Sequence, residues 1–331
     1  MPYVVDPTNT DRRFSRNAIR HTLERIRQEE VLPSPMSYAK MTPYMAFLDR
    51  YRTMMSNEVV RLTSTMLTVD PDIGTAFLVI QPKQDNWFAN QHVAVRLLSR
   101  LIAWASPSHN PVRFQKVVDL YRKMANYVYH QVDFRPSTTA NCIVVAPSFR
   151  KSGVWAIGRE PLAHGRRKGQ VMPINASMVW DRRYRLRLRP TFAGAKEETG
   201  EKELAQRLFA SYMRQTEGLV APHVSASTLV SFRFTISQIS QDDIHYLQRA
   251  RRPIMSPKHH IALKHFLQTI PVISRFTIPG IYWDGTTSTG HTIHQLIAIP
   301  SLGINLKESL MHIDCTFMKT LLMQEESTPR E

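Results

Sequence analysis

The chain has 331 residues, of which 43 % are hydrophobic, so it is long enough for one large or two ordinary domains with a buried core. Its formal net charge of +16 indicates an anionic partner, most often nucleic acid and otherwise an anionic membrane surface. Twelve glycines without a GxGxxG or GxxxxGKS/T spacing argue against Rossmann and P-loop nucleotide sites, whose glycines bring the backbone close to phosphates.

The cysteine content and the lengths of the apolar runs indicate in which cellular compartment the protein is expected. Cys142 and Cys315 are too few for a disulfide framework, which favours free thiols in a reducing compartment. No apolar run approaches the roughly 20 residues that span a bilayer, and residues 1–14 contain no signal-peptide core. We therefore expect an intracellular protein, neither secreted nor transmembrane, in the mitochondrial matrix or associated with a virus.

Residues 1–135 are expected to form a helical domain with one short strand. Residues 15–30 have the apolar spacing of an amphipathic helix. A second helix is expected over residues 42–67, with Thr42 as the N-cap and Pro43 at the first helical position. The pattern then predicts a strand at 75–82 and helices at 90–105 and 110–130.

Residues 136–331 are expected to form an α+β domain with a mixed, largely antiparallel sheet and packed helices, so the chain as a whole is predicted to be α+β. Ser240 and Asp243 have the spacing of a capping box at a helix start. A surface helix is expected over residues 196–218, a hairpin over 278–300 and a C-terminal helix over 305–323. The tetrapeptide Arg-Phe-Thr-Ile occurs at 233–236 and again at 275–278, which suggests two equivalent strands.

The most informative stretch holds five arginines within residues 182–189. Side chains of a strand alternate between two faces, so a strand here places Arg183, Arg185, Arg187 and Arg189 together, about 7 Å apart, with Tyr184, Leu186 and Leu188 on the other face. A helix would scatter both sets. Guanidinium groups bind phosphate oxygens through two parallel hydrogen bonds, which favours a polyanion-binding face, although pairing with carboxylates elsewhere in the chain is the alternative.

Other basic segments extend the predicted contact with nucleic acid. The candidate binding residues are Arg12, Arg13, Arg16, Arg166, Arg167, Lys168, Arg183, Arg185, Arg187, Arg189, Arg251, Arg252 and Lys258. Trp155, Trp180 and Phe192 flank the central segment, and exposed rings beside arginines are what base stacking requires. No signature of an RRM or KH domain accompanies them, so base-specific readout is not expected.

No motif predicts catalysis, a metal site or a cofactor. The helical histidines His260 and His265 are five residues apart, and zinc-binding helices use a spacing of three or four. His291 and His294 have odd spacing on a predicted strand and so point to opposite faces. Asp242 and Asp243 lie at a helix start, where acids stabilise the helix dipole.

These patterns predict a non-catalytic, RNA-binding structural component of a large ribonucleoprotein assembly, of the mitochondrial ribosomal or viral nucleoprotein type. Its expected partners are nucleic acid, with RNA favoured, and other protein subunits of the assembly, with no small-molecule substrate. One alternative is a viral matrix or capsid protein that binds genome or an anionic membrane. A second alternative is a histidine- or metal-dependent enzyme acting on nucleic acid.

Overall fold

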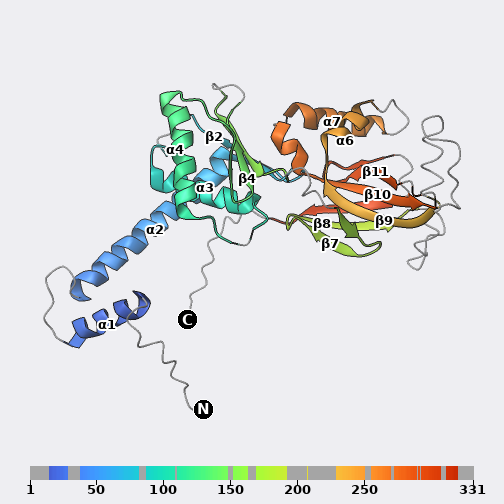
Figure 1. Ribbon diagram of the computed structural model, residues 1–331. Coiled ribbons are helices and arrows are strands. Elements are labelled where there is room, and N and C mark those ends of the chain that lie inside the picture. The colour runs from blue at the N-terminus through green and yellow to red at the C-terminus, as the bar shows by residue number, and fades with distance from the viewer. Residues whose placement is uncertain are drawn as a thin grey trace, which may run out of the picture. The chain divides into compact units, whose positions relative to one another are not determined.

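The computed structural model has an α+β fold with three mostly antiparallel sheets, as predicted (Figure 1). The chain divides into two compact units, residues 1–60 and residues 61–331. The structure describes residues 15–28, 38–81, 87–108, 110–147, 152–162, 169–191, 207, 229–249, 255–269, 272–288, 290, 292–306 and 311–319. The helix predicted over 196–218 lies outside this part of the chain except for Arg207, which is helical.

Two helices account for the described part of the smaller unit. Helix α1 spans Ser15–Gln28, and α2 spans Tyr38–Met66, so its last residues belong to the larger unit. The predicted start of α2 is wrong, because the helix begins at Tyr38 and Pro43 lies inside it. Proline has no N–H, so the carbonyl of Ala39 lacks its usual intrahelical donor at that point.

The larger unit begins with a five-stranded antiparallel sheet, sheet A. Its strand order is β1 (Leu67–Asp70), β2 (Thr75–Val79), β5 (Val154–Arg159), β4 (Cys142–Val145) and β3 (Ser137–Thr139). Helices α3 (Gln91–Ala105) and α4 (Phe114–His130) pack against it, and Asn90 caps α3. Because β2 pairs with β5, the boundary predicted near residue 136 falls inside one sheet.

Sheets B and C stack face to face, and two helices cover the other side of sheet B (Figure 1). Sheet B has the order β12 (Ile304–Asn305), β11 (Thr292–Ile299), β10 (Pro279–Thr287), β9 (Leu229–Gln238) and β6 (Gln170–Met172). Sheet C has the order β13 (Met311–Phe317), β8 (Tyr184–Pro190) and β7 (Ser177–Trp180). The covering helices are α6 (Gln241–Arg249) and α7 (Pro257–Thr269).

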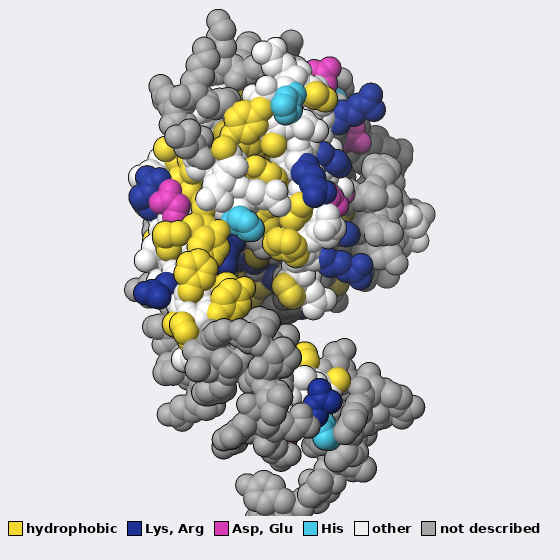
Figure 2. Space-filling view, turned by 90° about the vertical axis from the view of Figure 1, so that its left-hand side faces the viewer, with side chains coloured by type: hydrophobic (Ala, Val, Ile, Leu, Met, Phe, Trp, Pro, Cys, Tyr) yellow, Lys and Arg dark blue, Asp and Glu magenta, His cyan; other side chains and the backbone are white. Residues whose placement is uncertain are grey.

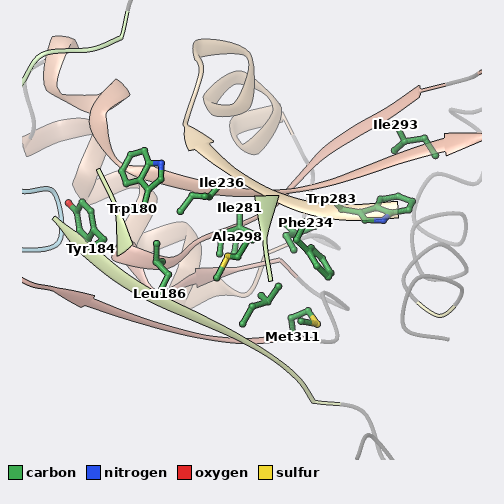
Figure 3. Packing of buried hydrophobic residues seen from close by; sticks show 13 residues of the cluster. Trp180, Tyr184, Leu186, Phe234, Ile236, Ile281, Trp283, Ile293, Ala298 and Met311 are labelled. Carbon is green, nitrogen blue, oxygen red and sulfur yellow. The ribbon is translucent and has the colours of Figure 1, made fainter. Parts of the chain in front are cut away.

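The core between sheets B and C explains why β8 is a strand (Figure 3). Tyr184 and Leu186 of β8 point inward and pack with Phe234 of β9 and Ile281 of β10. Apolar residues at every second position therefore bury one face of β8 and leave the other face outside. Alternation of this kind positions the arginines described below.

Three sequence-based expectations have clear outcomes here. The capping box is confirmed, since the Asp243 N–H donates to Ser240 Oγ over 3.1 Å and the Ser240 N–H donates to Asp243 Oδ2 over 2.6 Å. The C-terminal helix is wrong, because Met311–Phe317 pairs with β8 as a strand. Equivalence of the two Arg-Phe-Thr-Ile copies is also wrong: the first lies in β9, whereas Arg275 lies in the 3-10 helix η5 (Val272–Thr277).

Helix length and composition also bear on membrane insertion. Among the helices that the structure describes, none combines the length and the apolar character needed to cross a membrane.

Candidate nucleic-acid interface

The outer face of β8 carries three of the predicted arginines. Arg185 and Arg189 are exposed and Arg187 is partly buried, whereas Leu186 and Leu188 between them are fully buried. The predicted alternation is therefore confirmed over residues 184–189. We call the outward side of β8, with Arg185, Arg187 and Arg189, the basic face.

Neighbouring strands complete the surface of the basic face. On β7, Val179 lies opposite Arg185 and Ser177 lies opposite Arg187. On β13, the residues opposite Arg185, Arg187 and Arg189 are Thr316, Asp314 and His312, in that order. These neighbours are small or polar, so long guanidinium side chains can reach beyond them.

The described residues neutralise the charge on the basic face only in part. Asp314 forms an ion pair with Arg189, and its other carboxylate oxygen lies 3.0 Å from His312 Nε2. Arg187 Nε donates to the backbone carbonyl of Asn175 over 3.3 Å. The structure shows no hydrogen bond or ion pair for Arg185 among the described residues. Counted over the described residues of this face, three guanidinium charges against one carboxylate give a net charge of +2 when His312 is neutral.

Arg183 was predicted to share this face, and that prediction is wrong. Residues 181–183 form the turn between β7 and β8, where Asp181 and Arg182 both have positive φ angles of 48° and 54°. The turn ends at Arg183, whose N–H donates to the Trp180 carbonyl, so its side chain is not in phase with β8. The side chain of Arg183 is fully buried.

The buried guanidinium of Arg183 is held by an ion pair with Asp181 and a hydrogen bond to a backbone carbonyl. Its Nε and Nη2 lie 2.9 and 2.8 Å from Asp181 Oδ2, and Nη2 donates to the Thr277 carbonyl over 2.7 Å. Arg159 Nε donates to the same Asp181 oxygen over 3.1 Å. Burial, and then the positive charge of Arg183, lowers the pKa of Lys319 nearby. We call Arg159, Asp181 and Arg183 the buried cluster.

Among the remaining predicted binding residues, Lys258 does not join the basic face. Lys258 is exposed on α7, in the helical layer on the other side of sheet B. Arg16 lies on α1 in the smaller unit, and nothing is described of its side chain. Outside the described residues lie Arg12, Arg13, Arg166, Arg167, Lys168, Arg251 and Arg252. Figure 2 shows a face on which Lys and Arg are dispersed among hydrophobic side chains.

The two described aromatic residues that were predicted to stack on bases, Trp155 and Trp180, are buried. Trp155 lies in the core beside sheet A, where its ring packs edge-on against Tyr127 and Phe134. Trp180 is buried between sheets B and C, and Phe192 lies outside the described residues. Neither tryptophan can therefore stack on a base.

The sequence did not indicate a second polar group, which lies on the side of sheet B that faces away from sheet C. His294 Nδ1 lies 2.6 Å from Asp284 Oδ1, and Thr235 Oγ1 donates to Asp284 Oδ2 over 3.0 Å. Arg233 Nε lies 3.5 Å from the same carboxylate, and the Tyr282 ring stacks on the imidazole with centroids 4.5 Å apart. We call Thr235, Asp284 and His294 the sheet B network. Its sequence signal was the predicted hairpin, which brings Asp284 and His294 opposite each other.

Electrostatics in the sheet B network favour an ion pair. The hydrogen bond to Asp284 raises the pKa of His294 despite partial burial. Burial alone would raise the pKa of Asp284, but hydrogen bonds from His294 and Thr235 together with the positive charges of His294 and Arg233 lower it. Among the described residues, no group of three or more His, Cys, Asp and Glu side chains could hold a metal ion.

Comparison with models of protein families and with curated proteins finds no match to this chain.

Proposed function

We propose that the chain is a non-catalytic RNA-binding component of a large ribonucleoprotein assembly, and that the basic face binds the phosphate backbone. The observation that carries this proposal is the alignment of Arg185, Arg187 and Arg189 on one outward side of β8, over a buried apolar side. A chain with net charge +16 would supply long-range attraction toward a polyanion.

The chemistry of the basic face suits phosphate better than bases. Arginine forks match phosphate oxygens, and Arg185 has no competing partner among the described residues. Because Trp155 and Trp180 are buried, the described part of the interface lacks tryptophan rings for stacking. We therefore expect binding that depends little on sequence and strongly on salt.

The test compares the wild-type chain with a variant in which Arg185, Arg187 and Arg189 are all replaced by alanine. Binding to a fluorescent single-stranded RNA is measured by anisotropy across a salt series. Each phosphate contact contributes about 0.7 to the slope of log K against log salt, so the variant should lose about 2 from the slope as well as affinity at low salt.

A matched control separates the basic face from net charge. Replacement of exposed Arg113, Arg122 and Arg135 by alanine removes the same formal charge from another part of the larger unit. This control should keep most of the RNA affinity. Equal losses in both variants would contradict the proposal, as would binding of the wild type to anionic vesicles with none to RNA.

A further inference from the structure

The side of sheet B that faces away from sheet C carries a row of charged side chains across three strands. Arg233 of β9 lies opposite Asp284 of β10, and Asp284 lies opposite His294 of β11. The side chains of Arg233 and His294 are 63 % and 62 % exposed, whereas that of Asp284 is 20 % exposed. We call Arg233 and His294 the cationic pair.

The alternation of side chains along β9 and β11 fixes the direction in which the cationic pair points. The next residues along these strands, Phe234 and Ile293, are buried in the core between sheets B and C. Successive side chains of a strand point to opposite faces, so Arg233 and His294 point away from that core. The basic face also points away from it, but on the side of sheet C. Two cationic surfaces therefore lie on opposite sides of the same pair of stacked sheets.

Contacts on two sides hold the imidazole of His294. Its Nδ1 lies 2.6 Å from Asp284 Oδ1, and its ring stacks on the Tyr282 ring with an interplanar angle of 10°. Tyr282 is buried, and its hydroxyl donates to Asp243 Oδ2 over 2.7 Å. The structure shows no hydrogen bond of His294 Nε2 among the described residues. This nitrogen can therefore donate to a ligand when the imidazole is protonated.

The guanidinium of Arg233 is the second donor group of the cationic pair. Its Nε lies 3.5 Å from Asp284 Oδ2, and within the described part of the chain no other ion pair or hydrogen bond of Arg233 is shown. Both Nη groups can therefore donate to a ligand. One guanidinium and one imidazolium against one carboxylate give the row a net charge of +1. Asp284 weakens the attraction for an anion, but its hydrogen bond raises the pKa of His294 and so favours the imidazolium.

A row of hydroxyl groups adjoins the cationic pair. Ser231, Thr286 and Thr292 lie opposite one another on β9, β10 and β11, two residues from the charged row on each strand. An offset of two residues puts them on the same side of the sheet, about 7 Å away. Ser231 and Thr292 are exposed. Hydroxyl groups donate hydrogen bonds to phosphate oxygens, so this row suits an anion bound by Arg233 and His294.

We propose that the cationic pair binds an RNA phosphate, and that the chain thereby bridges two RNA segments, one on each side of the stacked sheets. This role rests on the proposed function, because it takes RNA as the ligand of the basic face. Stacked sheets lie about 10 Å apart, and Arg187 and His294 point outward from opposite sides of the stack, so one phosphate cannot contact both. Two phosphate sites that face opposite ways join separate parts of an RNA.

An RNA-bridging assay with the full chain tests the proposal. A single-stranded RNA is immobilised, the chain is added in limiting amount, and retention of a second, fluorescent single-stranded RNA is measured at about pH 6, where His294 is protonated. The wild type should retain the fluorescent RNA. Arg233→Gln with His294→Gln removes both charges but keeps side-chain donors for Asp284. This variant should bind the immobilised RNA and retain about tenfold less of the second RNA, from about threefold for each exposed ionic contact.

Two further variants serve as controls. Arg113→Gln with His130→Gln removes the same kinds of group from exposed positions beside the start and at the end of α4, and it should retain the second RNA as the wild type does. Replacement of Arg185, Arg187 and Arg189 by alanine should abolish bridging from the other side of the stack. Circular dichroism confirms that each variant is folded.

The outcomes separate the bridging role from the proposed function. A wild type that does not bind the immobilised RNA overturns the proposed function, and the bridging role with it. A wild type that binds this RNA without retaining the second one overturns the bridging role alone. Full retention by the Arg233 and His294 variant, or an equal loss in the α4 control, also overturns it.

The strength of the site on sheet B should depend on pH through His294. The described charged groups around it are Asp284 on β10, Arg233 on β9 and Asp243 on α6. The hydrogen bond to Asp284 raises the pKa of His294, partial burial lowers it, and the charges of Asp284 and Asp243 raise it further. Retention of the second RNA should fall about threefold between about pH 6 and pH 8, as the imidazolium is lost. A fall of equal size in His294→Gln would contradict this assignment.

NMR of the histidine side chains tests the site directly. Inorganic phosphate and the single-stranded RNA are added in separate titrations to the full chain with ¹³C-labelled histidine. Both should shift the resonance of His294 and leave that of His130 unchanged. A His294 resonance that RNA does not shift overturns the proposal, even where inorganic phosphate shifts it, because the site would then bind only small anions.

Discussion

Arg183 and Arg185 are two residues apart, yet they occupy opposite environments. Arg183 is fully buried and shares Asp181 with Arg159, whereas Arg185 is exposed and has no described partner. The comparison shows that an arginine-rich stretch is not one functional unit. A buried guanidinium requires a partner for its charge, and an exposed one remains available for a ligand.

The buried cluster connects parts of the larger unit that are distant in sequence. Arg159 belongs to sheet A, Asp181 to the turn of sheet C, and the Thr277 carbonyl to the residues leading into β10. Packing is tight there, because a Cβ on Gly74, whose φ is +60°, would lie 2.9 Å from Arg183 Nη1. Arg183 therefore holds parts of different sheets together, whereas the basic face is the surface that we propose binds phosphate.

The largest expected effect is on stability at Arg183. We expect Arg183→Ala to lower the free energy of unfolding by about 3 kcal/mol, because it empties a packed site and breaks a buried charge pair. Chemical denaturation followed by circular dichroism measures the change.

Arg185→Ala is the matched control for this stability effect. It should change the free energy of unfolding by no more than about 0.5 kcal/mol, as for other exposed positions. Equal destabilisation by the two substitutions would contradict the prediction that Arg183 stabilises the fold and Arg185 does not.

Thiol labelling provides a local measure of the same cluster. Burial raises the pKa of Cys142 to about 12, although the charges of Arg159 and Arg183 oppose this rise. The thiol also lies 3.2 Å from the Ile102 carbonyl, so it should react with iodoacetamide only when the structure opens.

Substitution of Arg183 should raise the labelling rate of Cys142 by up to about 100-fold, in line with a loss of about 3 kcal/mol in opening free energy. Mass spectrometry of the labelled peptides distinguishes Cys142 from Cys315. An unchanged rate in Arg183→Ala would mean that this guanidinium does not hold the region around Cys142 closed.

Sequence patterns were reliable where side chains alternate over a common core. The arginines at 185, 187 and 189 and the apolar residues between them followed the period of a strand. The same signal was present in Met311–Phe317, where alternation marks a strand that was predicted as a helix. Its partner β8 lies more than 100 residues away, so the pairing itself has no local signature.

Local sequence could not reveal features set by the tertiary fold. Asp181 and Arg182 adopt positive φ without glycine or asparagine, so only the aspartate gives a weak sequence signal for the turn that removes Arg183 from the basic face. The tetrapeptide Arg-Phe-Thr-Ile is a strand when it pairs with β10, and a 3-10 turn where it precedes that strand. Pairing partners, rather than the four residues, decide the conformation.

The next largest expected effect is on RNA affinity, through the number of guanidinium groups on the basic face that are free of an ion pair. Asp314 forms an ion pair with Arg189, so Asp314→Asn should release that guanidinium and raise the net charge of the face by one. We expect RNA binding to tighten by about 2–5-fold at low salt, which corresponds to one exposed ionic contact. The gain should shrink as salt is added, because exposed charges are screened.

Asp119→Asn is the control for a simple change in net charge. Asp119 is exposed on α4, where it pairs with Arg122, so its substitution removes the same charge away from the basic face. RNA affinity should change less in this variant. A gain equal to that of Asp314→Asn would assign the effect to the overall charge of the chain.

The smallest effect is expected in the sheet B network. Its ion pair is neither fully buried, as Arg183 is, nor fully exposed, as Arg185 is. His294 is largely exposed and Asp284 is partly buried. Asp284→Asn should lower the pKa of His294 toward its ordinary value, because the carboxylate that raises it is gone. Titration of the His294 imidazole by NMR measures this shift. The loss in stability should stay below about 1 kcal/mol, as for other accessible pairs.

The pH dependence of this loss in stability shows whether it comes from the charges of Asp284 and His294. The raised pKa of His294 stabilises the fold below the ordinary pKa of 6.5, and this contribution disappears as the pH rises through the raised value. The lowered pKa of Asp284 stabilises the fold above 3.8, and this contribution disappears as the pH falls through the lowered value. The difference in unfolding free energy between wild type and Asp284→Asn should therefore be largest between about pH 4 and pH 6.5. A difference that is constant from pH 4 to pH 9 would mean that Asp284 acts through its hydrogen bond with Thr235 rather than through the charge of His294.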